Sequence, residues 1–175
     1  MTITPDTKDW TWVLQRRCPE CGYDASATTR PAVPGLIRAN AAAWETALRG
    51  RNPADLRTRP REHRWSAVEY GCHVRDVFRI FDRRLMMMLE QDDPMFPNWD
   101  QDATAVADRY QEQDPSVVSG QLTESAHRIA GRFAGLTGPQ WERPGSRSDG
   151  AQFTVDSFAR YLIHDPVHHL HDVSG

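Results

Sequence analysis

The segment WSAVEYGCHVRDV, residues 65–77, carries the clearest helix-start signal in the chain. Ser66 and Glu69 have the spacing of a capping box, in which each side chain accepts a hydrogen bond from the other residue's backbone N–H. Beyond it, apolar residues recur at intervals of three and four, the period of one helix face. We therefore expect a helix over residues 66–89.

The same apolar period predicts three more long helices. They cover residues 31–48, 114–136 and 154 to the C-terminus, and a short helix is expected over 103–110. The connections between them are rich in proline and charge, and no strand-like alternation of useful length occurs. The pattern predicts an all-α protein, a four-helix bundle with one long crossover connection.

Residues 1–30 lack this period and are expected to form an irregular arm beside a bundle domain of residues 31–175. The arm contains a tight turn, Cys18-Pro-Glu-Cys21-Gly. Two cysteines are half of a zinc site, so a four-cysteine site would require two chains. Three roles of this turn remain possible: a secondary metal site at Cys18 and Cys21, a redox or disulfide role, and a turn without chemistry. Cys72 is expected to be a small core residue.

The composition is that of one ordinary globular domain. The chain has 175 residues, of which 39% are hydrophobic and 26% charged, and its formal net charge is −3. This charge gives no overall attraction to nucleic acid or to a membrane surface. No apolar run approaches the roughly 20 residues of a membrane span, and the first residues lack a cationic segment followed by an apolar run, so we expect neither a membrane helix nor a signal peptide. We expect a cytoplasmic protein with a small-molecule substrate. The six arginines from Arg49 to Arg64 are expected in a solvated loop, with a clamp for a carboxylate or phosphate, or a contact with nucleic acid, as the alternatives.

The histidines carry the strongest chemical signal. His164 and His168 are four residues apart, so both point from one helix face and can grip one ion. His73 lies on the apolar stripe of another helix, which makes it the candidate third ligand. Neutral imidazole binds zinc, nickel and iron(II) well. Three protein ligands leave a position open, as in catalytic sites.

Other polar residues are assigned lesser roles. Asp165 and Asp172 lie within three or four residues of His168, and either is a candidate to accept the second ring N–H of a ligating imidazole and fix its tautomer. Asn40, Trp99 and Asp100 are candidates to face the site. His171 is the reserve ligand, His169 is expected to point away from the pair, and His63 and His127 are expected on the surface.

The capped helix with His73, the long crossover and a last helix with His-x-x-x-His resemble the DinB/YfiT-like superfamily of metal-binding four-helix bundles. The resemblance covers residues 31–173. It implies one divalent ion held by His73, His164 and His168. It also implies a thiol-dependent transferase or isomerase that uses mycothiol, bacillithiol or glutathione.

Three functions remain open on this basis. The first is a metal-dependent transferase or isomerase with a low-molecular-weight thiol such as mycothiol. The second is a metal-dependent hydrolase, in which water replaces the thiol. The third is a non-catalytic metal-binding stress protein. Zinc is the favoured ion, nickel and iron are alternatives, and association into a homodimer stays open.

Overall fold

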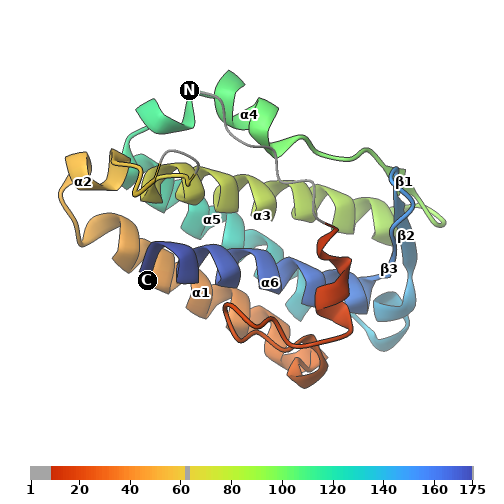
Figure 1. Ribbon diagram of the computed structural model, residues 1–175. Helices are drawn as coiled ribbons and strands as arrows, with labels where there is room; N and C mark the ends of the chain where they lie inside the picture. Colours follow the sequence, from red (N-terminus) through yellow and green to blue (C-terminus); the bar gives the residue numbers. More distant parts are fainter. Residues whose placement is uncertain (1–8, 62–63, 175) are drawn as a thin grey trace.

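The computed structural model describes residues 9–61 and 64–174. Four long helices form the bundle: α1 (Val33–Arg49), α3 (Ala67–Glu90), α5 (Pro115–Ala134) and α6 (Val155–Ser174). Helix α5 packs on α1 and α3, and α6 packs on the same two helices from the other side. Figure 1 shows this arrangement, with short elements at both ends. The expected all-α four-helix bundle is confirmed.

Helix α3 begins as its sequence predicts. The Glu69 side chain accepts a hydrogen bond from Ser66 N at 2.9 Å, and Ser66 Oγ accepts one from Glu69 N at 3.4 Å. Helix α5 is capped by Asp114, whose Oδ1 accepts from Ser116 N at 2.8 Å. These caps satisfy backbone donors that the first helical turn leaves without partners.

Helix α6 is continuous from Val155 to Ser174 and contains Pro166 in its interior. The carbonyl oxygen of Pro166 accepts hydrogen bonds from Trp44 Nε1 at 3.1 Å and from Asn40 Nδ2 at 3.2 Å. Both donors are buried residues of α1. These bonds fix α6 against α1, and with it the register of the histidines on α6.

Short elements fill the connections. They are α2 (Pro53–Arg57), α4 (Gln101–Ala107), β1 (Met95–Phe96), β2 (Pro144–Arg147) and β3 (Gln152–Thr154), with the 3₁₀ turns η4 (Tyr110–Glu112) and η5 (Gly138–Glu142). The expected helix over 103–110 is thus α4, which starts and ends earlier. The arginine-rich segment contains α2, where a loop was expected, and Arg59 forms a buried ion pair with Glu69.

The three-stranded sheet was not expected from the sequence. Strand β2 pairs in parallel with β1 and antiparallel with β3, aligning Gly145 with Phe153. A Cβ atom on Gly145 would lie 2.7 Å from Met88 Cγ, so only glycine lets the sheet approach α3 this closely. Its strands are too short to show an alternating pattern.

The described part of the arm, residues 9–30, consists of turns and the 3₁₀ segments η1 (Trp10–Leu14) and η2 (Ala25–Ala27), and a third segment, η3 (Arg30–Ala32), leads into the bundle. It lies along α6, where Val13, Cys18 and Ala25 are buried. Tyr23 anchors it by donating from its hydroxyl to the carbonyl of Arg160 at 3.0 Å. The arm therefore forms a wall beside the side chains that α6 presents on this face.

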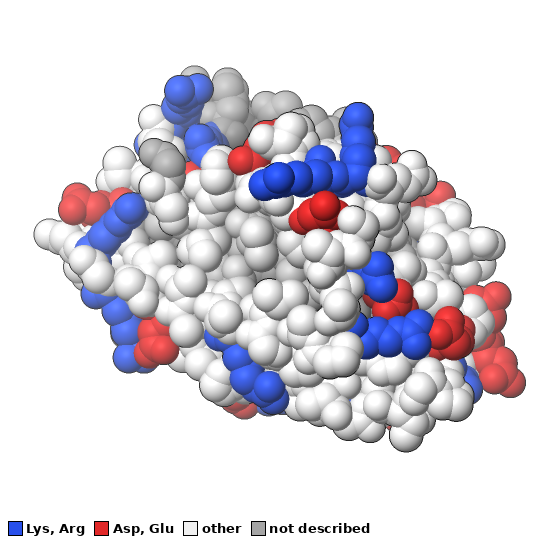
Figure 2. Space-filling view, turned by 90° about the horizontal axis from the view of Figure 1, so that it is seen from below, with Lys and Arg blue, Asp and Glu red and all other residues white. Residues whose placement is uncertain are grey.

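None of the helices in the described ranges is long and apolar enough to span a membrane. On the face seen from below, basic and acidic side chains lie interspersed among uncharged residues (Figure 2). No continuous basic stripe crosses this face among the described residues. This distribution matches the small negative net charge.

Candidate metal-binding site

Helix α6 presents two pairs of ligand-type side chains on adjacent faces. The first pair is His164 and His168, and the second is Asp165 and His169. Because one residue turns a helix by about 100°, the second pair is rotated from the first by that angle. The first pair meets Cys18 and Cys21 of the arm, and the second meets His73 of α3.

His73, Asp165 and His169 form a cluster whose ligand atoms lie within 4.8 Å of one another. His73 Nε2 lies 3.2 Å from Asp165 Oδ1, and His169 Nε2 lies 3.8 Å from the same oxygen. Two atoms that bind one ion at about 2.1 Å are separated by about 3.0–3.4 Å. The cluster therefore fits a divalent ion after little movement. Two histidines and one carboxylate are a donor set of catalytic zinc and of iron(II).

Neighbouring side chains hold this cluster in place. His169 Nδ1 lies 3.2 Å from Asp172 Oδ2, and Asp172 accepts a hydrogen bond from Arg64 at 2.8 Å. The indole of Trp99 stacks on the His73 ring, with centroids 5.2 Å apart and planes 7° from parallel. Such contacts fix the ring orientation and tautomer of a ligating histidine.

Asp165 is ionised at neutral pH. Burial raises the pKa of its carboxyl group, but the neighbouring His73 and His169 outweigh this and hold the pKa well below its usual range. Burial also raises the pKa of Asp172, and the hydrogen bond with His169 outweighs it in the same way. The site therefore offers anionic oxygen, which a cation requires of a carboxylate ligand.

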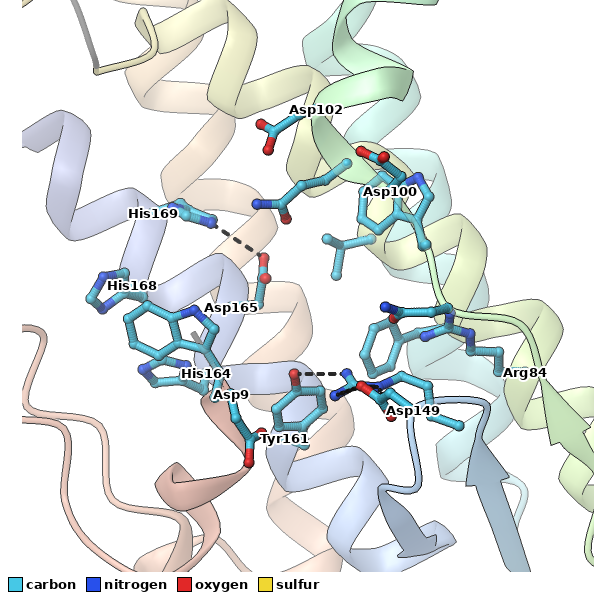
Figure 3. Close-up of a pocket in the computed structure, with 17 residues that line it drawn as sticks. Asp9, Arg84, Asp100, Asp102, Asp149, Tyr161, His164, Asp165, His168 and His169 are labelled. Carbon is cyan, nitrogen blue, oxygen red and sulfur yellow. Dashed lines mark hydrogen bonds and ion pairs between the residues drawn. The ribbon is translucent and has the colours of Figure 1, made fainter. Parts of the chain in front are cut away.

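The cluster adjoins a cavity of about 520 Å³. Asp165 and His169 line it, whereas His73 is fully buried behind Trp99. Figure 3 shows Asp165 directed towards His169, with Asp100 and Asp102 at the α4 side of the cavity. The rest of the wall is mixed in character: Asp9, Trp10, Val77, Phe81, Arg84, Asn98, Trp99, Gln101, Arg147, Asp149, Tyr161, His164 and His168.

Two arginines lie in the cavity wall and differ in their partners. Arg147 pairs with Asp149 at 2.7 Å and donates to the Tyr161 hydroxyl at 3.2 Å. Arg84 is buried and donates to the carbonyl of Pro97 at 2.7 Å, and within the described ranges it forms no ion pair. Burial, followed by the charge of Arg147, lowers the pKa of Arg84 to about 10, so it stays cationic at neutral pH.

The second cluster consists of Cys18, Cys21, His164 and His168, again with ligand atoms within 4.8 Å of one another. The cysteines are not joined in a disulfide. Burial lowers the pKa of His164 to about 4 and also lowers the pKa of His168. Both imidazoles are thus neutral at pH 7, the form that binds metal.

The ligand set expected from the sequence is divided between these clusters. The structure brings His164 and His168 together, with ring centroids 5.1 Å apart, but it places His73 with Asp165 and His169 instead. His169 points away from the His164/His168 pair, as expected, and the adjacent face of α6 that carries it meets His73 of α3. The Asp-x-x-x-His spacing of the second pair was the available signal.

The lesser candidates also receive definite positions. Trp99 and Asp100 line the cavity as expected. Asn40 does not, since it is turned into the contact between α1 and α6. Asp172 lies nearer to His169 than to His168, at 3.2 Å against 3.9 Å. His127 and His171 are exposed, Cys72 is buried, and His63 lies outside the described residues.

Comparisons with known proteins agree with this architecture. A family model described as "DinB superfamily" matches residues 36–173. A solved structure, YfiT from Bacillus subtilis, aligns over 83% of this chain and 85% of its own, with a TM-score of 0.75 and 19% identity. YfiT is described as a probable metal-dependent hydrolase with an unusual four-helix bundle topology. No curated protein sequence matches the chain significantly.

Proposed function

The chain belongs to the DinB superfamily, and from this we propose that it is a metal-dependent enzyme that uses a low-molecular-weight thiol. The enzyme either joins the thiol to a small electrophile or isomerises the electrophile with the help of the thiol. We place its centre at His73, Asp165 and His169. The observation that carries the proposal is that these ligand-type side chains meet at the wall of a cavity of about 520 Å³. This volume lies in the range of small-molecule sites.

A divalent ion at this centre supplies a Lewis acid that favours the deprotonated form of a thiol or a water molecule. His73 on α3 and two residues on α6, Asp165 and His169, would hold that ion between two helices. Asp172 orients His169, and Trp99 covers His73. Zinc and iron(II) both suit this donor set, so we propose zinc as the ion with iron as its competitor.

Arg84 gives the cavity a recognition element. It is a buried cation to which no described carboxylate is paired, and it faces the same space as Asp165. A buried charge without a counterion is costly, and an anionic ligand relieves that cost. We therefore expect the thiol or the electrophile to carry a carboxylate or phosphate that Arg84 binds.

The second candidate is a metal-dependent hydrolase, which the description of YfiT favours. Asp100 and Asp102 line the same cavity, and in this second candidate one of them would act as the base that accepts a proton from water. Such an enzyme needs no thiol. A third reading, a metal-binding protein without catalysis, predicts neither activity.

The deciding experiment is a thiol panel on the full-length protein reconstituted with zinc or iron(II). Mycothiol, bacillithiol, glutathione and cysteine are each supplied with an electrophilic aromatic halide, and ester hydrolysis is followed without thiol. We expect thiol consumption that depends on the metal and is lost in the His73→Ala and Asp165→Asn variants, while His127→Ala remains active. Thiol-independent ester hydrolysis lost in the same two variants would replace the transferase with the hydrolase. Inactivity of the reconstituted protein in both assays would overturn the proposal.

A further inference from the structure

The Cys18-Pro-Glu-Cys21-Gly22 turn has a fixed backbone that directs both thiols to one side. Cys18 N donates to the carbonyl of Tyr23 at 2.8 Å, and Gly22 N donates to the carbonyl of Cys18 at 3.0 Å. Gly22 has a φ of 76°, a left-handed conformation that glycine adopts without strain. The turn therefore holds both thiols on the side that faces His164 and His168.

The thiols of this turn and the imidazoles of the two histidines that face it have separations that suit a shared ion. Cys18 Sγ lies 3.7 Å from His168 Nδ1. In a tetrahedral zinc site with Zn–S near 2.3 Å and Zn–N near 2.0 Å, sulfur and nitrogen lie about 3.5 Å apart. All four ligand atoms fall within 4.8 Å of one another. Two cysteines and two histidines complete a structural zinc site within one chain, so no second chain is needed.

The remaining polar atoms around this cluster also match a metal site. His164 Nε2 is buried and has no hydrogen-bond partner within the described part of the chain. His168 turns its other nitrogen, Nε2, towards Glu20 Oε2 at 3.7 Å and Asp172 Oδ2 at 3.9 Å. A carboxylate behind a ligating imidazole is the usual arrangement in zinc sites. Buried polar atoms without partners are costly, and an ion satisfies them.

We propose that Cys18, Cys21, His164 and His168 bind a second ion, a structural Zn²⁺ that fastens the N-terminal arm to α6. The ion would be closed to substrate by its four ligands, unlike the three-ligand centre at His73. It would also shape the cavity, because Trp10 packs on the rings of His164 and His168 with centroids 5.4 and 5.1 Å away. Trp10 itself lines the cavity wall.

The first test is X-ray absorption at the zinc edge of the full-length protein, together with zinc content. We expect sulfur scatterers at about 2.3 Å and about two zinc ions per chain, falling to about one in the Cys18→Ser/Cys21→Ser variant. The matched control is Cys72→Ala, whose thiol contacts the Tyr110 carbonyl in the core and which should keep both ions. Zinc without sulfur neighbours in the wild-type protein would overturn the proposal, regardless of the zinc content of the variants.

Cobalt substitution separates this site from the catalytic proposal. The wild-type protein should show a sulfur-to-cobalt charge-transfer band without added thiol, and His73→Ala should retain it. The Cys18→Ser/Cys21→Ser variant should lose the band while still binding cobalt at the other centre. Absence of the band from the wild-type protein, or a Cys18–Cys21 disulfide in the metal-loaded protein, would rule the site out. If the wild-type protein bound an ion at the cysteine site but none at the His73 centre, the result would count against the proposed function and would leave this second site intact.

Discussion

His73 Nε2 lies 3.2 Å from Asp165 Oδ1, although 92 positions separate the two residues in the sequence. The first belongs to α3 and the second to α6, so the candidate centre depends on how these two helices are aligned. The residues that determine where α3 starts and which face α6 turns towards α3 therefore also determine the positions of the ligand side chains.

The interactions at the start of α3 should contribute substantially to the free energy of unfolding. Glu69 is buried and accepts hydrogen bonds from Ser66 N and Arg59 Nε, each at 2.9 Å. The Glu69→Gln substitution should therefore lower the free energy of unfolding by about 1–3 kcal/mol, measured by urea denaturation at pH 7. The matched control is Glu45→Gln, which breaks the exposed Glu45–Arg49 pair and should cost less than about 0.5 kcal/mol. Equal losses in the two variants would contradict this reading.

The same group makes a pH-dependent contribution of known sign. Burial raises the pKa of Glu69, but the hydrogen bonds from Arg59 and Ser66 outweigh it, and the pKa is lower than usual. The folded state therefore favours the ionised form over the unfolded chain, whose glutamates titrate near pH 4.3. The stabilisation is present above that pKa and is lost as pH falls through the folded-state value. The stability gap between wild type and Glu69→Gln should shrink in acid, and a gap that widens there would refute the assignment.

Arg84 should govern binding of an anionic substrate. The Arg84→Met variant should raise KM for a carboxylate-bearing substrate by about tenfold or more with a smaller change in kcat, because a charge-assisted hydrogen bond is lost. Arg84→Lys should recover part of the effect. Arg83→Met, at the exposed neighbouring position, is the control and should leave KM unchanged. A KM that stays at the wild-type value in Arg84→Met would remove Arg84 from substrate recognition.

Asp172 should tune the affinity of the centre for its ion. Its carboxylate faces His169 Nδ1 and is itself held by Arg64. In the Cys18→Ser/Cys21→Ser background, Asp172→Asn should weaken metal binding by about 10–100-fold while saturating metal still binds. Isothermal titration with zinc measures this change. Glu20→Gln in the same background is the control, since Glu20 faces His168 and not His169. Unaltered affinity in Asp172→Asn would show that the contact is incidental.

The helices could be predicted because their signals are local. The capping box at Ser66, the Asp114 cap and the apolar periods depend on neighbours within a few residues, and each helix begins close to its expected residue. The small sheet could not be predicted in this way. Its strands are two to four residues long, and the parallel pairing of β1 with β2 joins segments about 50 residues apart.

The grouping of ligands needed information that the sequence does not hold locally. A pattern of His164, Asp165, His168 and His169 defines two faces of α6, but only the packing decides which face meets α3. The hydrogen bonds of Asn40 and Trp44 to the Pro166 carbonyl fix that rotation. The partners of Cys18 were hidden for a similar reason, since the arm reaches a residue 150 positions away.

The most direct test of the central proposal is the metal content of the Cys18→Ser/Cys21→Ser variant before and after a further His73→Ala substitution. Removing the cysteines isolates the centre at His73, Asp165 and His169 from the arm site. After reconstitution with zinc, we predict about one ion per chain in the double variant and almost none once His73 is replaced. A further His127→Ala substitution should change nothing. If the ion stays bound without His73, the proposed centre lies elsewhere and the account is contradicted.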